Sequence, residues 1–258
     1  MNFFYVPDGQ DGFLAQPATA SPWGPDSQHG GPPAALLTRA IERLGEAPRR
    51  TIGRFTMELL GPVPVGPLAV SATVLRPGRS VELRAATLVD RALSRPVATA
   101  TAWMFPDTAD GPRPGTEPPG HAPEDGQPHT RPPQWSGGYL DAVEWRWVKG
   151  SVWQSGPAVV WMRPRVGLVE GETTSPLQRL MACADSASGV SAELEPSEWG
   201  FQNTELTVHV LRPPVGEWLC LDAVTTLGPG RVGTAVSEVY DGQGLVARTA
   251  QALLVARR

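Results

Sequence analysis

The amino-acid sequence predicts an α+β protein made of two copies of one unit, in which a helix precedes an antiparallel sheet. A helical pattern occurs once in each half and is followed by extended segments separated by Gly–Pro turns. Turn sequences also recur in the same order when the chain is shifted by about 150 residues. Pro-Val-Gly stands at 64–66 and 214–216, and Thr-Ala-x-Ala stands at 99–102 and 249–252. A duplicated helix-plus-sheet unit accounts for both observations.

The first unit is expected to contain one helix, which begins after Gly30 and Gly31. Two glycines allow a close approach of the backbone, and a proline fits the first helical turn. Apolar residues recur at helical spacing from Ala34 to Leu44. Extended segments are expected before the helix, at 2–6 and 12–15, and four strands after it, at 54–60, 68–75, 80–89 and 96–104.

A segment rich in proline separates the two units. Residues 106–134 combine many prolines with glycines and charged residues and contain few apolar side chains. Such a composition cannot bury enough surface to fold by itself. We therefore expect an extended linker between an N-terminal unit of residues 1–105 and a C-terminal unit of residues 135–258.

The second unit is expected to contain a helix that begins at Ser175. Ser175 is a typical N-cap, Pro176 fits the first helical position, and an apolar stripe runs to Ala184. Asp185 falls at the edge of this stripe, where a solvated carboxylate is the simpler interpretation of the segment alone. Strands are expected at 142–148 and 158–163 before the helix, and at 205–211, 218–226, 232–240 and 245–256 after it.

The composition excludes several classes of function. A net charge of −4 leaves no basic surface for nucleic acid. The longest apolar runs fall short of the roughly 20 residues that span a membrane. The four histidines lack metal-ligand spacing, so neither a metal nor another cofactor is expected. Cys183 and Cys220 fit small core residues in a reducing compartment, which predicts a cytoplasmic protein.

Four segments together resemble a known family. They are H-G-G-P-P-A-A-L-L-T-R-A at 29–40, the Ala184-Asp185 pair, the strand block at 201–220 that contains L-R-P followed by E-W-L, and G-L-V-A-R-T-A-Q-A-L-L-V at 244–255. In these segments the chain resembles double-hotdog proteins of the acyl-CoA thioesterase II type, over nearly its whole length except the linker. The resemblance implies that each half wraps a sheet around one helix and that the two sheets join into one continuous sheet.

The resemblance also implies a set of site residues. In that family an aspartate, a threonine or serine, and a glutamine orient the attacking water, without a covalent acyl-enzyme. By position the aspartate is Asp185 and the glutamine is Gln251. The hydroxyl position departs from the family, because Asn203 occupies it and Thr204 follows. Strand alternation places Thr204 on the face of Leu206 and Asn203 on the other, and we rank Asn203 first because an amide also offers a donor and an acceptor.

These residue types suit the hydrolysis of a thioester, which needs a positioned water, a base and a site for the oxyanion. Asp185 is expected to take the proton of the water if a position at the margin of the core raises its pKa. Gln251 and Asn203 are expected to orient the water by hydrogen bonds. Backbone N–H groups at Gly30 and Gly31 are candidates for binding the oxyanion.

The repeat offers an internal control for this site. At the same shift Asp185 corresponds to Ala35 and Gln251 to Thr101, so one site per chain is expected. His29 is expected to shape the turn before the first helix. Five tryptophans are expected in the core or in the wall of an acyl pocket: Trp145, Trp147, Trp153, Trp161 and Trp218.

The sequence therefore favours an enzyme that hydrolyses an acyl thioester carried by CoA or by a carrier protein. It leaves the oligomeric state open and is compatible with a homo-oligomer of double-hotdog chains. One alternative is a hotdog hydratase or dehydratase, which needs a His/Asp pair that the sequence does not place near Asp185. The other is a non-catalytic acyl-thioester-binding or scaffolding protein, which the loss of the hydroxyl at Asn203 supports.

Overall fold

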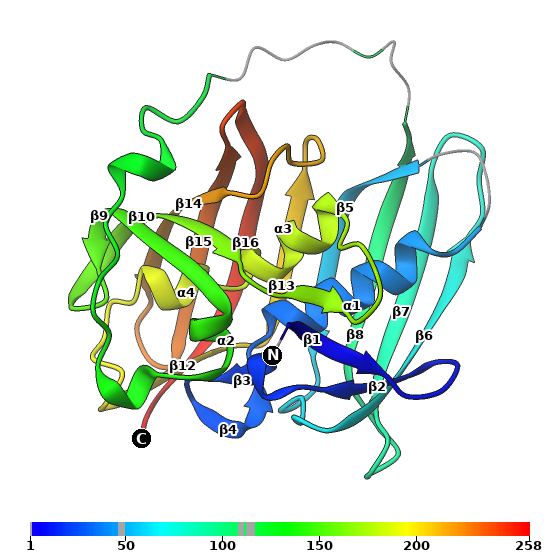
Figure 1. Ribbon diagram of the computed structural model, residues 1–258, viewed down its shortest axis with the longest axis horizontal. Helices are drawn as coiled ribbons and strands as arrows, with labels where there is room; N and C mark the ends of the chain where they lie inside the picture. Colours follow the sequence, from blue (N-terminus) through cyan, green and yellow to red (C-terminus); the bar gives the residue numbers. More distant parts are fainter. Residues whose placement is uncertain (1, 46–49, 108–110, 112–116) are drawn as a thin grey trace.

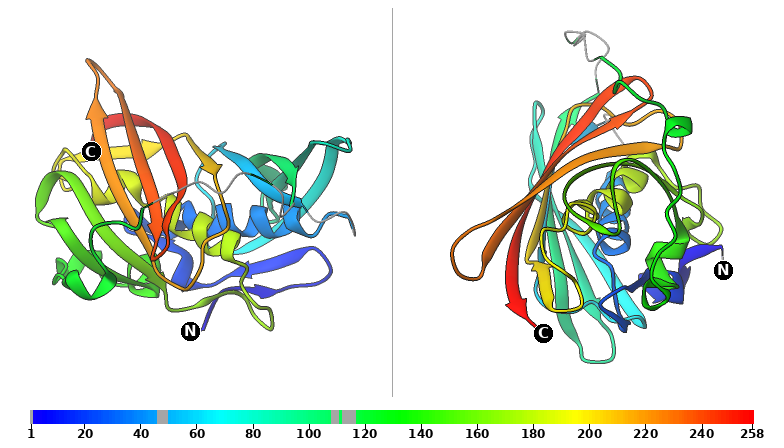
Figure 2. Two further views of the ribbon diagram at one scale, coloured as in Figure 1. Left: turned by 90° about the horizontal axis from the view of Figure 1, so that it is seen from above. Right: turned by 90° about the vertical axis from the view of Figure 1, so that its left-hand side faces the viewer.

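A large curved sheet wraps around two central helices in the computed structural model, which describes residues 2–45, 50–107, 111 and 117–258 (Figures 1 and 2). The two helices are α1 (Gly31–Glu42) and α3 (Pro176–Ala184). The sheet contains 14 strands among the described residues, and a separate two-stranded sheet pairs β3 (Ala20–Ser21) with β4 (Gly24–Gln28). None of the helices in these ranges is long and apolar enough to cross a membrane.

The large sheet is built from two halves in mirrored order. The first half contributes β1 (Phe3–Pro7), β2 (Gly12–Ala15), β5 (Arg50–Leu59), β6 (Pro67–Arg76), β7 (Glu82–Asp90) and β8 (Arg95–Pro106). The second contributes β9 (Val143–Ser151), β10 (Gln154–Pro164), β13 (Glu205–Val210), β14 (Leu219–Leu227), β15 (Val232–Asp241) and β16 (Gly244–Arg257). Two short strands, β11 (Gly167–Val169) and β12 (Trp199–Asn203), pair with β1 and β16.

The two halves meet where β5 pairs with β13. From this junction the order runs outward through β8, β7, β6, β2 and β1 on one side, and through β16, β15, β14, β10 and β9 on the other. Thr56 lies opposite Thr207 across the junction, and their hydroxyl oxygens are 3.1 Å apart. The structure therefore confirms the expected α+β fold, with two helix-plus-sheet units joined into one continuous sheet.

The helices α1 and α3 run antiparallel and in close contact inside this sheet. Gly31, at the start of α1, lies against the carbonyl oxygen of Ala182 near the end of α3, and a Cβ atom there would overlap this oxygen. The pair of glycines before α1 is thus explained at Gly31 by the close approach of two backbones.

The start of α3 is capped as expected. The hydroxyl of Ser175 accepts a hydrogen bond from the backbone N–H of Gln178 at 3.1 Å, and the Gln178 side chain accepts one from the N–H of Ser175. The carboxylate of Glu42, at the end of α1, accepts hydrogen bonds from Ser175 and Gln178. This cluster ties the end of one helix to the start of the other.

Several details differ from the sequence prediction. The helix α1 ends at Glu42, so Leu44 lies beyond it, and α3 ends at Ala184, so Asp185 is its C-cap residue. The short helices α2 (Gly138–Ala142) and α4 (Ala187–Val190), and the strands β3, β4, β11 and β12, were not expected. These elements are too short for a periodic pattern to reveal them.

The described part of the proline-rich segment packs on the second half. It contains 3₁₀ turns at Pro123–Asp125 and Pro133–Trp135. Gln127 and Trp147 exchange two backbone hydrogen bonds of 2.9 Å, and the indole N–H of Trp161 donates to His121. Residues 108–110 and 112–116 of the expected linker lie outside the described residues. The boundaries of the two units and the linker stay predictions.

Asp241, at the end of β15, forms a buried ion pair with Arg212. Both carboxylate oxygens accept hydrogen bonds of 2.6 Å from the guanidinium, and the backbone N–H groups of Val215 and Gln243 donate two more at 2.7 Å. Burial alone would raise the pKa of Asp241, but these donors outweigh it and lower the pKa.

We expect the substitution Asp241→Asn to lower the free energy of unfolding by about 3 kcal/mol, because it leaves the Arg212 charge without its partner. A lowered pKa stabilises the fold above the unfolded-state pKa, so the difference should persist down to about pH 4 and shrink only as the pH falls further. Urea unfolding at neutral and acidic pH measures it. Asp90→Asn is the control, because Asp90 accepts only from the N–H groups of Ala92 and Leu93. Equal urea midpoints for Asp241→Asn and Asp90→Asn at neutral pH would contradict the expectation.

Candidate functional site

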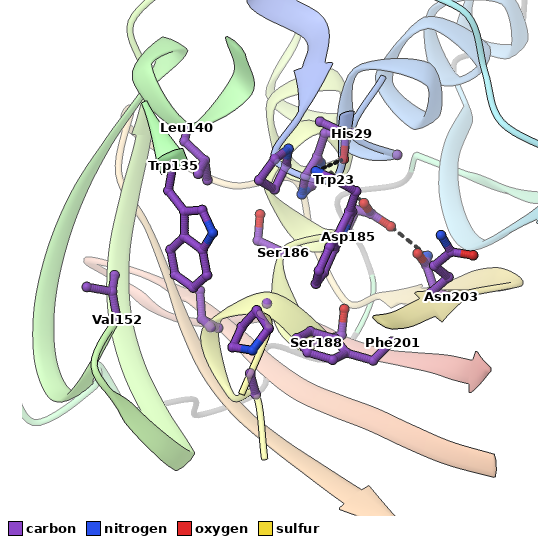
Figure 3. Close-up of a pocket in the computed structure, with 18 of the residues that line it drawn as sticks. Trp23, His29, Trp135, Leu140, Val152, Asp185, Ser186, Ser188, Phe201 and Asn203 are labelled. Carbon is purple, nitrogen blue, oxygen red and sulfur yellow. Dashed lines mark hydrogen bonds and ion pairs between the residues drawn. The ribbon is translucent and has the colours of Figure 1, made fainter. Parts of the chain in front are cut away.

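The carboxylate of Asp185 lies at the end of α3, where side chains from two strands meet it. Figure 3 shows the contact with Asn203. The amide nitrogen of Asn203, on β12, donates to Oδ1 at 2.8 Å. The amide nitrogen of Gln251, on β16, donates to the same oxygen at 3.0 Å and to the backbone oxygen of Asp185 at 3.1 Å. The structure thus brings together three residues that are far apart in the sequence.

Gln251 is fully buried, and every hydrogen-bonding atom of its amide is used. Its nitrogen makes the two bonds to Asp185, and its oxygen accepts from the backbone N–H of Ser188 at 3.1 Å. An amide with all its partners satisfied by protein is held in one orientation. Gln251 therefore fixes Asp185 relative to the start of α4.

Asn203 contacts Asp185, whereas Thr204 is exposed and lies outside both flanking strands. The chain bends between β12 and β13 at Thr204, so strand alternation does not run through this point. Within β12, alternation places Asn203 on the same face as the buried Phe201. The prediction that Thr204 and Leu206 share one strand face is therefore wrong, because the bend at Thr204 interrupts the strand.

The backbone at the start of α1 also faces this carboxylate. The backbone N–H groups of Gly30 and Gly31 lie near enough to the carboxylate to lower its pKa, while the N–H of Gly31 donates its hydrogen bond to Nδ1 of His29. A Cβ atom at residue 30 would lie only 2.7 Å from Oδ2 of Asp185. Gly30 has an ordinary helical φ of −67°, so the need for glycine comes from the close approach of Asp185 and not from the backbone conformation.

Burial raises the pKa of Asp185 to about 7, although the hydrogen bonds from Asn203 and Gln251 and the nearby backbone N–H groups of Gly30 and Gly31 act in the opposite direction. The residue is only 6% exposed. Near neutral pH both the acid and the carboxylate are populated, which is the condition under which a general base works well.

His29 is a member of the site that the sequence did not reveal. Its Nδ1 lies 3.2 Å from Oδ2 of Asp185 and accepts a hydrogen bond of 3.1 Å from the N–H of Gly31. Its ring stacks on Tyr139, with centroids 3.8 Å apart and an interplanar angle of 9°. Burial lowers the pKa of His29 to about 3, so the imidazole is neutral. The expectation that no histidine lies near Asp185 is wrong, and His29 does more than shape a turn.

Tyr139, on α2, is itself held in place by the end of α3. Its hydroxyl donates to the carbonyl oxygen of Ala182 at 2.7 Å and lies 3.0 Å from the hydroxyl of Ser186. The orientation of the His29 ring is therefore fixed by the same helix end that carries Asp185.

Asp185, Asn203, Gly30 and Thr204 line a cavity of about 1040 Å³ (Figure 3). Three of the five expected tryptophans, Trp145, Trp147 and Trp153, also line it. The other two belong to a separate cluster on the opposite face of β10, where Trp161 packs with Cys220 and Trp218 covers them. No group of three or more His, Cys, Asp and Glu side chains gathers as a metal site within the described ranges.

The register of the strands changes the internal comparison between the halves. Thr56 and Thr207 face each other at the junction, and their partners on the next strands are Thr101 and Ala250. Gln251 therefore corresponds to Ala102 rather than to Thr101.

The helix ends change the comparison in the same way. Asp185 is the C-cap of α3, and the C-cap of α1 is Arg43 rather than Ala35. Beside Arg43, the carboxylate of Glu42 is tied to Ser175 and Gln178. The described residues of the first half offer neither the amide nor a free acid at these positions. The second half therefore carries the acid and the amide without a counterpart in the first.

Comparison with protein families finds matches over both halves. A family model described as the acyl-CoA thioesterase N-terminal domain matches residues 19–105, and one described as the acyl-CoA thioesterase C-terminal domain matches residues 123–255. A search of curated proteins found no significant match.

Solved structures of similar fold cover nearly the whole chain. A protein assigned as a thioesterase II from Thermobifida fusca YX has a TM-score of 0.77 and 20% identity, and the match covers 98% of this chain and 95% of that one. A tesB protein from Mycobacterium avium subs paratuberculosis has a TM-score of 0.68 and 16% identity, with 98% and 96% covered. The acyl-CoA thioesterase II TesB2 from Mycobacterium marinum has a TM-score of 0.65 and 18% identity, with 89% of each chain covered. At these identities the likeness shows the fold.

Proposed function

The chain belongs to the acyl-CoA thioesterase family and is a thioester hydrolase, and we propose that Asp185 is the base that activates water in its reaction. The observation that carries the proposal is the buried Asp185 carboxyl, which has a pKa of about 7 and lies at the wall of a cavity large enough for a substrate.

The proposed step needs no covalent intermediate. Asp185 accepts a proton from water as the water oxygen attacks the thioester carbonyl carbon, and a tetrahedral oxyanion forms. When this species collapses, the carbon–sulfur bond breaks and the thiolate takes the proton from Asp185. The products are a carboxylic acid and a free thiol, and Asp185 returns to its starting state.

The neighbours of Asp185 divide into two roles in this proposal. Gln251 holds the carboxylate by the hydrogen bond that its amide nitrogen donates. The N–H of Gly31 is engaged with Nδ1 of His29, so of the two expected oxyanion donors we keep the N–H of Gly30. The bonds of Asn203 to Asp185 and Glu205 use only its amide nitrogen, which leaves its oxygen to orient the water.

Release of free thiol from acyl-CoA and from acyl-carrier thioesters tests the proposed function. We expect release that depends on the enzyme, together with a carboxylic acid product identified by mass. A protein that binds these thioesters without releasing thiol would be a non-catalytic binding protein, and the proposal would fail.

We further propose that His29 positions Asp185 and adds to the effect of burial on its pKa. Nδ1 accepts the N–H of Gly31, so it carries no proton, and it faces Oδ2 at 3.2 Å. The proton that can join these two acceptors is that of the Asp185 acid, so neutral His29 stabilises the protonated form of Asp185.

The substitution His29→Ala is expected to move the acidic limb of the kcat/KM profile to lower pH by about one unit. The acid form loses its acceptor and water enters beside the carboxylate, and both changes lower the pKa. The plateau should also fall by about tenfold or more, because the base is less well oriented.

The substitution His29→Asn serves as the matched variant, because an asparagine oxygen can occupy the position of Nδ1. We expect its acidic limb to return toward that of the wild type. If the acidic limb of the kcat/KM profile is unchanged in both variants and only their stability falls, the role of His29 is structural.

The contact between His29 and Asp185 also bears on the alternative of a hydratase or dehydratase. The His/Asp pair that such an enzyme needs is present as His29 and Asp185, whose Nδ1 and Oδ2 atoms lie 3.2 Å apart. Incubation with 2-enoyl-CoA decides between the reactions. Formation of 3-hydroxyacyl-CoA without thiol release would favour the alternative.

Two further expectations stay predictions. Cys183 and Cys220 are both buried free thiols, which fits a reducing compartment and supports the proposed cytoplasmic location. The formation of homo-oligomers awaits a measurement of molecular mass in solution.

A further inference from the structure

We propose that the acyl group accepted by this cavity carries a ring, aromatic or alicyclic, rather than a straight chain; the inference rests on the proposed thioester hydrolysis. It is drawn from the composition, rigidity and size of the cavity wall beside Asp185.

Indole rings form a large share of the apolar part of this wall. Of the nine tryptophans in the chain, five line the cavity together with Phe201. They are Trp23, Trp135, Trp145, Trp147 and Trp153. Aromatic side chains offer large flat faces and prefer offset or edge-to-face contact with other rings.

Several of these rings are held in fixed orientations. The indole N–H of Trp145 donates to the carbonyl oxygen of Leu140 at 2.9 Å. Trp153 is 66% exposed, and its indole N–H donates to the carbonyl oxygen of Thr130 at 3.0 Å. Trp147 is stacked by His129, with ring centroids 5.8 Å apart and an interplanar angle of 5°. A wall fixed in this way cannot collapse around a thin chain as flexible aliphatic side chains can.

One aromatic pair stands directly beside the proposed base. Trp23 and Phe201 pack edge to face, with centroids 5.0 Å apart and an interplanar angle of 89°. Figure 3 shows this pair on the side of the cavity that carries Asp185, with Trp135 on the opposite side. A ring held near the thioester carbonyl would therefore meet aromatic faces on both sides.

The size of the cavity favours a rigid, wide group over a flexible, narrow one. Its volume of about 1040 Å³ lies at the upper end of the range of ligand sites, roughly 300–1,000 Å³. A single methylene chain in a wide space leaves wall atoms without contacts and loses its own rotational freedom on binding. A ring fills more of the width and has less freedom to lose.

The first test compares two acyl-CoA substrates with the same number of carbons and an unconjugated carbonyl, 3-phenylpropanoyl-CoA and nonanoyl-CoA. We expect kcat/KM to be about tenfold higher for the ring-bearing substrate. 3-Cyclohexylpropanoyl-CoA extends the comparison to an alicyclic ring, for which the same preference is expected. A preference for nonanoyl-CoA would overturn the inference.

The second test removes one aromatic face. Trp135→Leu is expected to lower kcat/KM for 3-phenylpropanoyl-CoA by about tenfold more than for nonanoyl-CoA. Trp135→Phe, which keeps a ring, should retain most of the ratio and serves if the leucine variant folds poorly. Trp103→Leu is the matched control, because Trp103 lies on β8 beneath Arg76 and is not part of the wall. Equal losses for both substrates in Trp135→Leu and Trp135→Phe would contradict the inference.

The proposed function and the inference about the acyl group fail in different experiments. If neither acyl-CoA releases thiol, the proposed function fails with the inference. If both are hydrolysed without preference for a ring, the function stands and the inference about the acyl group is wrong.

Discussion

The substitution Asp185→Asn is expected to reduce thioester hydrolysis by at least about a thousandfold while the protein stays folded. An asparagine at this position keeps an oxygen for the amides of Asn203 and Gln251, and its nitrogen can donate to Nδ1 of His29. It cannot accept a proton from water near neutral pH. Thiol release from acyl-CoA measures the loss, and circular dichroism verifies the fold.

Asp222→Asn is the matched control for this variant, because Asp222 is an exposed carboxylate on β14 outside the cavity. It should retain wild-type turnover. Wild-type turnover by Asp185→Asn would instead remove Asp185 from the mechanism and leave it as a buried acid that joins α3 to the sheet.

The substitution Gly30→Ala is expected to lower kcat by about a hundredfold, because small displacements of a catalytic group carry costs of this order. The new Cβ would lie 2.7 Å from Oδ2 and 2.9 Å from Oδ1 of Asp185, so the carboxylate must shift. A shifted carboxylate weakens its bonds to Asn203 and Gln251. Steady-state kinetics with the preferred acyl-CoA measures the effect.

The control for this variant is Gly24→Ala, in the same segment of the chain. The nearest atom to a Cβ there is Oγ of Ser27 at 3.9 Å, an ordinary contact distance. We expect near-normal activity for this control. Equal activity of the two alanine variants would show that the carboxylate does not need the space beside Gly30.

Much of the fold could be predicted from the sequence because its signals are local. The capping residues Ser175 and Gln178 and the paired prolines after Gly31 mark the starts of the two helices. The helix ends were less well predicted. The apolar spacing continues to Leu44, although the helix α1 ends at Glu42. Helix ends carry weaker sequence signals than capped starts.

The site was predicted only in part, because its members depend on contacts between distant elements. Asp185, Gln251 and Asn203 followed from the family resemblance, and the structure brings them within hydrogen-bonding distance. His29 was missed because its role depends on Tyr139, which comes from a five-residue helix that no periodicity reveals. The glycines that follow His29 were the available signal, since they indicate that something approaches the backbone there.

The internal comparison shows a second limit of sequence reasoning. One constant shift between the halves makes Thr101 the counterpart of Gln251 and Ala35 the counterpart of Asp185. The strand register instead pairs Gln251 with Ala102, and the helix ends pair Asp185 with Arg43. The two halves differ in helix length, with 12 residues in α1 and 9 in α3. A single shift therefore cannot align both the helices and the strands.

The central claim, that burial holds the Asp185 carboxyl at a pKa near 7, is tested most directly by stability as a function of pH. The folded pKa of about 7 lies above the ordinary aspartate pKa of 3.8, so the folded state binds the proton more tightly and wild-type stability is lost as the pH rises between these values. Asp185→Asn lacks this proton. From about pH 4 to about pH 8, the unfolding free energy of the wild type should fall by about 4 kcal/mol relative to that of Asp185→Asn. Parallel curves for the two proteins over this range would contradict the claim.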